Sequence, residues 1–185
     1  MIDEAIADAE QRMKKAVAAL QRELDTIRTG RARPSLVEQL KVDHYDSTLP
    51  LNQLATISAP EARLLVIQPW DRQALGAIEK AIQKSDLGLN PINDGHTIRL
   101  AIPQLTEDRR KELVKSVHRK VEEGRVAVRN VRRHCHDGLR LLDKDKKISE
   151  DDDHRAQEQL QKLTDRFIEE IDKVGREKEA ELLEV

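Results

Sequence analysis

The first part of the chain carries apolar side chains three or four positions apart, which is the spacing of one buried face of an α-helix. This face consists of Ile2, Ile6, Ala9, Met13, Ala16, Val17, Leu20, Leu24 and Ile27. Thr29-Gly30 is predicted to end the helix, because glycine readily adopts the left-handed conformation that follows many helices. Pro34 bars any continuation.

A second long helix is predicted from Thr106 to about residue 143. Its apolar positions fall within an arc of roughly 100° at the helical period. They are Leu113, Val117, Val121, Gly124, Val128, Val131, Cys135, Leu139 and Leu142. Thr106 is a suitable N-cap, and Glu107 and Asp108 suit the positive first turn. The polar run 143–147 is typical of a turn.

Ser149 is predicted to cap a third helix, because Ser149-x-x-Asp152 approximates a capping box. The apolar face of this helix is formed by Ala156, Leu160, Leu163, Phe167, Ile171 and Val174. The acidic run 150–153 is open to interpretation as a metal site, but its place in a first helical turn favours interaction with the helix dipole. Three helices with one apolar stripe each predict an up-down three-helix bundle.

Between the first two helices the apolar period changes to that of short strands. Strands are predicted at 37–44, 54–58, 64–67 and 97–102, and a compact amphipathic helix at 71–85. Prolines and glycines separate these elements. We therefore expect an α+β fold in which a long three-helix bundle, residues 1–30 and 105–185, carries an inserted β/α/β domain at 31–104. Two linkers near 30–34 and 102–106 would form a two-strand hinge.

The composition narrows the class of protein further. Charged residues make up 37% of the chain, and Tyr45, Trp70 and Phe167 are its aromatic residues. Cys135 is the one cysteine, so an internal disulfide is excluded and a reducing compartment is indicated. The N-terminus is acidic where a signal peptide is basic, and no apolar run approaches membrane-spanning length. We expect a cytoplasmic monomer with no membrane association.

The net charge of −2 conceals an uneven distribution. Residues 105–142 hold 11 basic and 6 acidic side chains, a balance of +5, whereas residues 143–185 hold 9 and 15, a balance of −6. Local charge attracts a ligand more directly than the total does. A basic segment beside an acidic one therefore favours oriented binding to a polyanion.

The basic segment contains GRVAVRNVRRHCH at 124–136, a stretch without a carboxylate. Its four arginines are Arg125, Arg129, Arg132 and Arg133. Steps of about 100° per residue place them within an arc of about 100°. Lys111, Lys115, His118, His136 and Arg140 fall on or near the same stripe, with Glu122 as its one acid. The apolar stripe occupies the other side of the helix, so these cations are expected to face outward.

Two interpretations of the arginine stripe remain open on spacing alone. An ordinary solvated helix face is one, although such faces usually interleave opposite charges. The other is a binding site for nucleic acid, because the planar guanidinium group suits phosphate. No aromatic residue accompanies the arginines for bases to stack on. Folded RNA, read by its shape, is then a better target than a single strand.

Several longer strings resemble the bacterial ribosome recycling factor family. They are RVAVRNVRR at 125–133, KKISEDDDHRAQEQLQKLTD at 146–165, IRTGRA at 27–32, AIQKSDLGLNP at 81–91 and LTEDRRKEL at 105–113. The resemblance spans essentially the whole chain in the family's order. It implies a three-helix bundle with an inserted β/α/β domain, together shaped like a transfer RNA.

The resemblance also implies a mechanism without catalysis or a cofactor. The protein would bind the large ribosomal subunit across the A and P sites after peptide release. With elongation factor G and its GTP hydrolysis, it would split the subunits. Arg129, Arg132 and Arg133 would contact large-subunit RNA, and the geometry of the stripe adds Arg125, Lys111 and Lys115. The inserted domain would swing on its hinge and meet elongation factor G.

The linkers suit such a hinge. Gly30 allows unusual backbone angles, while Pro34 and Pro103 restrict the direction in which the chain leaves. Gln104 completes the second crossing. Arg31 and Arg33 are equally consistent with RNA contacts at the hinge and with solvated linker residues.

The sequence departs from the family pattern at two places. Asp46 stands where glycine is expected in a turn, and aspartate tolerates such turns. His134-Cys135-His136 replaces a plainer stretch after the arginines. Consecutive helical residues point in different directions and cannot converge on a metal ion. We therefore expect no metal site there and a core position for Cys135.

Two other classes of function compete with recycling on the sequence alone. A helical adaptor with protein-only partners is the alternative, since long amphipathic helices and an acidic third helix would suit it. An enzyme is not indicated. No histidine is paired with a suggestive serine or cysteine and a carboxylate, and no glycine-rich phosphate loop follows a strand.

Overall fold

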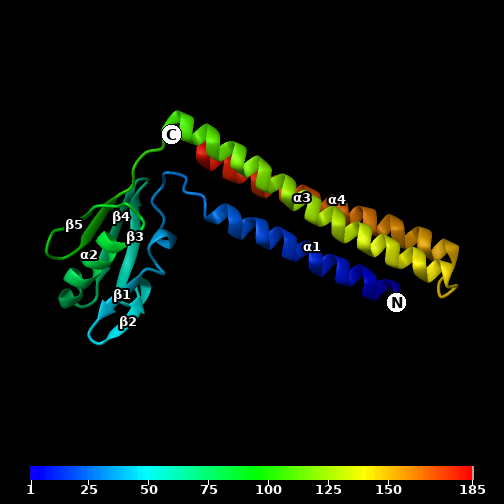
Figure 1. Cartoon of the computed structure of the whole chain (residues 1–185), viewed down its shortest axis with the longest axis horizontal. Coiled ribbons are helices and arrows are strands. Elements are labelled where there is room, and N and C mark those ends of the chain that lie inside the picture. Colours follow the sequence, from blue (N-terminus) through cyan, green and yellow to red (C-terminus); the bar gives the residue numbers. More distant parts are fainter. Residues whose placement is uncertain (185) are drawn as a thin grey trace. The chain divides into compact units, whose positions relative to one another are not determined.

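The computed structural model describes residues 1–184, which divide into two compact units. One unit comprises Met1–Arg28 and the chain from Glu107 onward, and the other comprises Thr29–Thr106. The first unit is helical and the second combines strands with a short helix, as Figure 1 shows. The predicted α+β fold class is confirmed.

The helical unit is an up-down bundle of α1 (Ile2–Asp25), α3 (Glu107–Lys144) and α4 (Glu150–Leu183). In Figure 1, α3 runs antiparallel to both α1 and α4. Each helix buries the stripe that its sequence period indicates. The core includes Met13, Leu24, Val117, Val128, Leu139, Leu160, Phe167 and Ile171. Burial of these faces positions the remaining face of α3 toward solvent.

The helix ends follow local hydrogen bonding. The Ser149 hydroxyl accepts a hydrogen bond from the backbone N–H of Asp152 at 3.0 Å, which confirms the predicted cap of α4. The predicted extension of the first helix to Thr29 is wrong, because α1 ends at Asp25. The hydroxyl and backbone N–H of Thr26 both donate to the Glu23 carbonyl, and these bonds close the last turn early.

The polar turn predicted between α3 and α4 is also present. Lys146 adopts a φ of 58°, in the left-handed region that glycine usually occupies after a helix. The backbone N–H of Lys147 donates to the Leu142 carbonyl at 2.9 Å, and that of Lys146 donates to Asp143 at 2.9 Å. These bonds satisfy carbonyls at the end of α3 without a glycine.

Two glycines in helix interiors bring the bundle helices close together. A Cβ atom on Gly175 of α4 would lie 2.5 Å from Cγ2 of Val121 on α3. A Cβ atom on Gly124 of α3 would lie 3.1 Å from Cδ1 of Ile171. Each glycine therefore makes room for a branched side chain of the facing helix.

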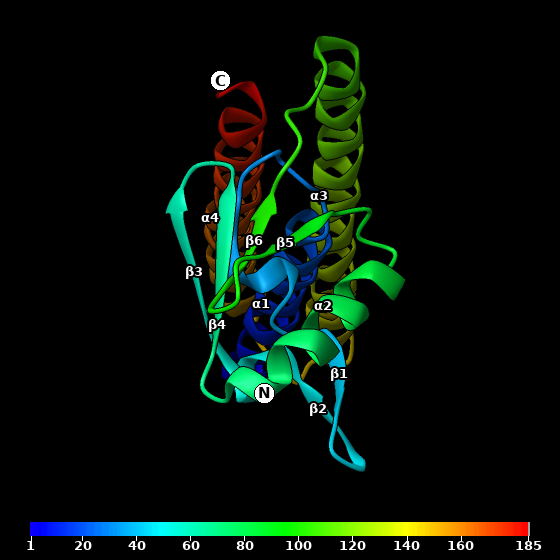
Figure 2. The same ribbon diagram turned by 90° about the vertical axis from the view of Figure 1, so that its left-hand side faces the viewer.

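The second unit is built on an antiparallel sheet in the order β3-β4-β6-β5. Its strands are β3 (Ala55–Glu61), β4 (Leu64–Pro69), β5 (Pro91–Asn93) and β6 (Ile98–Ala101). Helix α2 (Leu75–Lys84) follows a short 3-10 turn, η3 (Arg72–Ala74). Figure 2 shows α2 beside the sheet. Its apolar face, Leu75, Ile78 and Ile82, is buried in a core shared with Leu65, Ile67, Ile98 and Leu100.

A separate hairpin joins β1 (Lys41–His44) to β2 (Ser47–Pro50). The predicted strand at 37–44 is wrong in its first half, because the 3-10 turn η1 (Pro34–Leu36) and a hydrogen-bonded turn occupy residues 34–40. The strands β2 and β5 were not predicted. In the hairpin turn, Tyr45 rather than Asp46 takes the positive φ, at 44°.

None of the helices in residues 1–184 is long and apolar enough to span a membrane. Within the same residues, no group of three or more histidine, cysteine or acidic side chains is arranged to hold a metal ion.

Candidate nucleic-acid interface

Helix α3 fixes the direction of the predicted arginine stripe. Val117, Val121, Val128 and Cys135 are buried on one side of this helix. Because successive residues are offset by about 100°, the intervening cations point away from that side or lie at its edge. The stripe is thereby divided into arginines at the boundary with α4 and arginines that face solvent.

Arg125 lies at this boundary and is held by two carboxylates. Its guanidinium group is 2.7 Å from Oδ1 of Asp172 on α4 and 2.9 Å from Oε2 of Glu122. Hydrogen bonding to Glu122 and Asp172 raises the pKa of Arg125. Arg125 therefore does not face solvent freely, as expected for the stripe, but is paired with Glu122 and Asp172. The partner on α4 could not be read from the sequence around Arg125, because it is 47 residues away.

Arg129 is also paired, but more loosely. Its guanidinium group lies 3.3 Å from Oε1 of Glu122, and both side chains are about half exposed. Hydrogen bonding from Arg125 lowers the pKa of Glu122, and the positive charges of Arg125 and Arg129 add to this effect. Glu122 thus serves two arginines at once, which leaves positive charge in excess.

Arg132 and Arg133 differ from these two. Within residues 1–184, neither guanidinium group makes an ion pair or a hydrogen bond with the protein. Arg133 is exposed and Arg132 is half-buried. These two adjacent arginines keep their hydrogen-bonding groups available to an external ligand. The outward placement expected from the sequence is found for Arg133, whereas Arg132 lies at the edge of the buried side.

The lysines at the start of the stripe are exposed as well. Lys111 lies 3.2 Å from Glu107 in the preceding turn, an exposed pair that water screens strongly. Lys115 has no ion pair in the described part of the chain. Arg119, one turn after Lys115, is similarly exposed and unpaired among these residues, and it extends the stripe beyond the residues expected from the sequence. Its helical position, about 40° from Lys115, was the signal that could have identified it.

The proposed hinge residues all lie within the second unit. Gly30 adopts a φ of 75°, a conformation that favours glycine, and a Cβ atom there would lie 3.2 Å from Cγ of Leu105. Gln104 accepts a hydrogen bond from Arg63 at 2.8 Å, and the backbone N–H of Ala32 donates to Ala62 at 2.7 Å. Both linkers are therefore fastened to the same β3–β4 turn. Pro34 begins η1, and Pro103 is exposed.

The His134-Cys135-His136 stretch behaves as predicted for a helix. Cys135 is 8% exposed, and its thiol donates to the Ala5 carbonyl at 3.6 Å. Burial raises the pKa of the Cys135 thiol. His134 is exposed on another side of α3, and His136 lies 3.3 Å from Asp137. The core position expected for Cys135 is confirmed.

Comparison with known proteins identifies the family. The family model described as ribosome recycling factor matches residues 20–183. The ribosome-recycling factor of Thermomicrobium roseum is 58% identical over 185 residues, which is 100% of both chains. The corresponding protein of Carboxydothermus hydrogenoformans is 56% identical over the same span.

This chain belongs to the ribosome recycling factor family. The resemblance seen in the sequence strings is thereby confirmed. Ribosome recycling factors are translation factors without enzymatic activity, so the expectation that this member is not an enzyme is confirmed too.

Solved structures of recycling factors share the fold. A solution structure of a ribosome recycling factor is 47% identical and aligns over 100% of this chain and 98% of its own, with a TM-score of 0.77. A second structure describes the T. thermophilus ribosome recycling factor and E. coli elongation factor G bound to the E. coli post-termination complex. That recycling factor is 48% identical, with full coverage of both chains and a TM-score of 0.66.

Proposed function

We propose that this recycling factor binds the large ribosomal subunit of the post-termination complex through the outward face of α3. With elongation factor G and GTP, it then splits the subunits and frees mRNA and tRNA for a new round of translation. The relative from T. thermophilus supports this proposal, because it is described on the post-termination complex together with elongation factor G.

The observation that carries the RNA-binding part is the pair Arg132 and Arg133. Both belong to a helix of 38 residues, so they are presented on a stiff support. Neither is neutralised by a carboxylate of the described chain. Two guanidinium groups in this state can form bidentate hydrogen bonds with phosphate oxygens. We assign RNA contacts to Arg129, Arg132, Arg133, Lys111 and Lys115.

Arg125 takes a different part in this proposal. Its two carboxylate partners neutralise its charge and occupy most of its N–H groups, so it has less to offer a phosphate than its neighbours have. We therefore give Arg125 the role of orienting α3 on α4, which aims the neighbouring arginines.

The chemistry of the face favours folded RNA. Phe167 is the one aromatic residue among 1–28 and 107–184, and it is 1% exposed. Without an exposed phenylalanine, tyrosine or tryptophan, the bundle lacks the large rings on which the bases of a single strand usually stack. Arginines and lysines along a rod can instead follow the phosphates of a structured RNA, where the shape of the backbone is recognised.

The inserted domain would transmit the action of elongation factor G. Two chain crossings, at Gly30 to Pro34 and at Pro103 and Gln104, would restrict its motion more than one crossing could. A bundle of long packed helices would behave as a lever, because it deforms little when a force acts at one end. Such a factor would work in the cytoplasm, as a monomer.

The test compares binding to purified large subunits by wild type and by Arg132→Ala with Arg133→Ala. We expect the double variant to bind at least about tenfold more weakly, from the loss of two charged hydrogen-bonding groups. Arg176→Ala is the matched control, because this α4 arginine is exposed and has no ion pair in residues 1–184. Melting temperature should be unchanged in both variants.

Salt dependence separates this proposal from the adaptor alternative. Binding through phosphate contacts should weaken steeply as salt rises, because each contact releases counterions. The affinity of the double variant for large subunits should fall less steeply with salt than that of wild type. An adaptor with protein-only partners would bind large subunits no better than a charge-matched control protein. Equal binding by wild type and the double variant would remove the RNA-binding assignment.

A further inference from the structure

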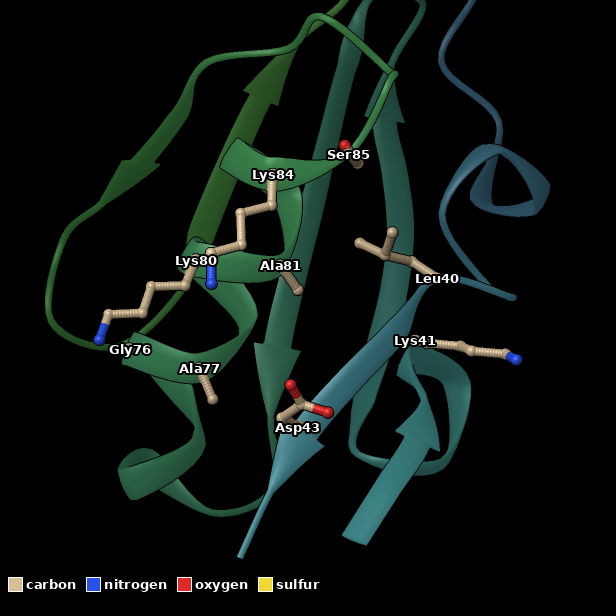
Figure 3. Close-up of a pocket in the computed structure, with 9 residues that line it drawn as sticks. All are labelled: Leu40, Lys41, Asp43, Gly76, Ala77, Lys80, Ala81, Lys84 and Ser85. Atoms are coloured by element: carbon tan, nitrogen blue, oxygen red, sulfur yellow. The ribbon is translucent and has the colours of Figure 1, made fainter. Parts of the chain in front are cut away.

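A groove in the inserted domain gathers all of its lysines. Residues 29–106 contain three lysines, Lys41, Lys80 and Lys84, and each of them lines this groove. The groove lies between β1 and α2 and has a volume of about 680 Å³. Figure 3 shows its lining residues.

The space between the lysines is partly apolar and also holds the Asp43 carboxylate. Leu40 from the β1 side and Ala77 and Ala81 from α2 form its apolar surface. In Figure 3, Ala77 and Ala81 point from α2 toward β1, while the amino groups of Lys41 and Lys80 lie at opposite margins. Small side chains at positions four apart on a helix let another backbone approach closely.

The groove carries an excess of positive charge in a domain that has none overall. Residues 29–106 contain 8 basic and 8 acidic side chains, so the domain is neutral as a whole. The lining has three lysines and one carboxylate, Asp43, which accepts a hydrogen bond from Thr48 at 2.8 Å. None of the three lysines makes an ion pair with a described residue. Their charges therefore remain available to a partner.

We infer that this groove binds an amphipathic helix of a protein partner that carries glutamates or aspartates beside its apolar face. Apolar side chains of the helix would cover Leu40, Ala77 and Ala81, and its carboxylates would meet the lysines. Helix α2 has 10 residues and is about 15 Å long, which matches two to three turns of such a partner.

The chemistry of the lining favours protein over RNA. No arginine and no aromatic residue is among its members, so bidentate phosphate contacts and base stacking are both missing. An apolar strip flanked by cations is instead the complement of an amphipathic acidic helix. The inference stands on the groove alone and does not depend on the recycling function.

The experiment titrates the ¹⁵N-labelled full chain with a synthetic amphipathic helical peptide of about 14 residues, or about 21 Å. The peptide carries leucines on one face and glutamates on both flanks. We expect saturable amide shifts that include Ala77, Lys80, Ala81 and Lys84, with a dissociation constant of about 1 mM or below. Two comparison probes are the same peptide with lysines in place of glutamates and a single-stranded RNA of about 12 nucleotides.

Variants connect the shifts to the groove. The double substitution Lys80→Glu with Lys84→Glu should lower the affinity for the acidic peptide at least about tenfold. The introduced carboxylates would repel the glutamates that the lysines attract. Both side chains are exposed, so the fold should be retained, and circular dichroism checks this. Arg99→Glu is the matched control in the same domain, outside the lining, and should change the affinity less than about twofold.

Three results would overturn the inference. The lysine peptide could bind as well as the acidic one, which would remove the charge argument. The RNA could shift these amides while the acidic peptide does not, which would make the groove a phosphate site. The acidic peptide could also give no saturable shift at all, which would leave the groove without the proposed ligand.

Discussion

Arg125 on α3 and Asp172 on α4 are joined by a 2.7 Å contact across the helical bundle. The arginine belongs to a stretch of 13 residues that contains no acid in the sequence. The folded chain supplies the missing acid from another helix. The arginines of this stretch therefore fall into two kinds in the folded protein. Arg125 stabilises the bundle, whereas Arg132 and Arg133 remain available to a ligand.

The first prediction concerns this ion pair. Arg125→Ala should lower the free energy of unfolding by about 1–2 kcal/mol, because it leaves the half-buried Asp172 without its partner. Urea denaturation measures the change, and Arg176→Ala on the exposed side of α4 should stay within about 0.5 kcal/mol of wild type. A double-mutant cycle with Asp172→Ala should give a coupling of about 1 kcal/mol. Unchanged stability together with weaker ribosome binding would instead make Arg125 an RNA ligand.

The second prediction concerns the close approach of α3 and α4. Gly175→Ala should destabilise the bundle by about 1–3 kcal/mol, because the added Cβ atom overlaps Val121. Gly138→Ala is the matched control within α3, since nothing lies within 4 Å of a Cβ atom there. That control should stabilise the protein by about 0.5–1 kcal/mol through helix propensity. Val121→Ala should recover part of the loss in the Gly175→Ala background, and a lack of recovery would contradict the overlap.

The third prediction is a pH dependence in the turn between β5 and β6. The backbone N–H groups of Thr97 and His96 donate to Asp94 and lower its pKa to about 2. A carboxyl group with a lowered folded pKa stabilises the folded state above its unfolded pKa of about 4. That contribution is lost as pH falls toward about 2.

The test of this turn combines two measurements. NMR titration of the Asp94 carboxyl should give a midpoint well below that of an ordinary aspartate. Asp94→Ala should destabilise the chain at pH 6, and the difference from wild type should shrink below about pH 4. Asp86→Ala, at an exposed position outside the turn, should show no such trend. A normal Asp94 midpoint would contradict the hydrogen-bonding account.

The fourth prediction concerns the hinge. Removing one residue between Gly30 and Pro34 should leave large-subunit binding intact but impair splitting with elongation factor G and GTP. The shortened linker would displace the inserted domain without touching the face of α3. Arg31→Ala with Arg33→Ala keeps the linker length and is the control. Normal splitting by the shortened variant would remove the lever from the mechanism.

The sequence predicted the helical part of the fold well, because burial at the helical period is a strong signal over many turns. The second helix was expected from Thr106 to about 143 and occupies Glu107–Lys144. The strands were harder to predict. The strand β5 has three residues and begins with proline, and β2 has two exposed residues followed by two half-buried ones, so neither shows an alternating pattern.

The candidate site was predicted only in part, for a physical reason. The direction of Arg132 and Arg133 follows from helix geometry alone, and the sequence contains that information. Whether an arginine meets an acid on another helix depends on how the two helices align, as at Arg125 and Asp172. The lysine groove likewise joins Lys41 to Lys80 and Lys84 across 39 positions of the chain, and no local pattern connects them.

Gly175 and Gly124 restrict the orientation of α3 within the bundle. With Val121 seated against Gly175 and Ile171 against Gly124, α3 cannot rotate about its own axis without steric collision. These contacts fix the direction in which every side chain leaves α3. The side chains so fixed include Arg132 and Arg133, which lie more than a helical turn after Gly124. The conformational entropy of orienting α3 is then lost when the chain folds. It does not have to be lost again each time the protein binds a ribosome.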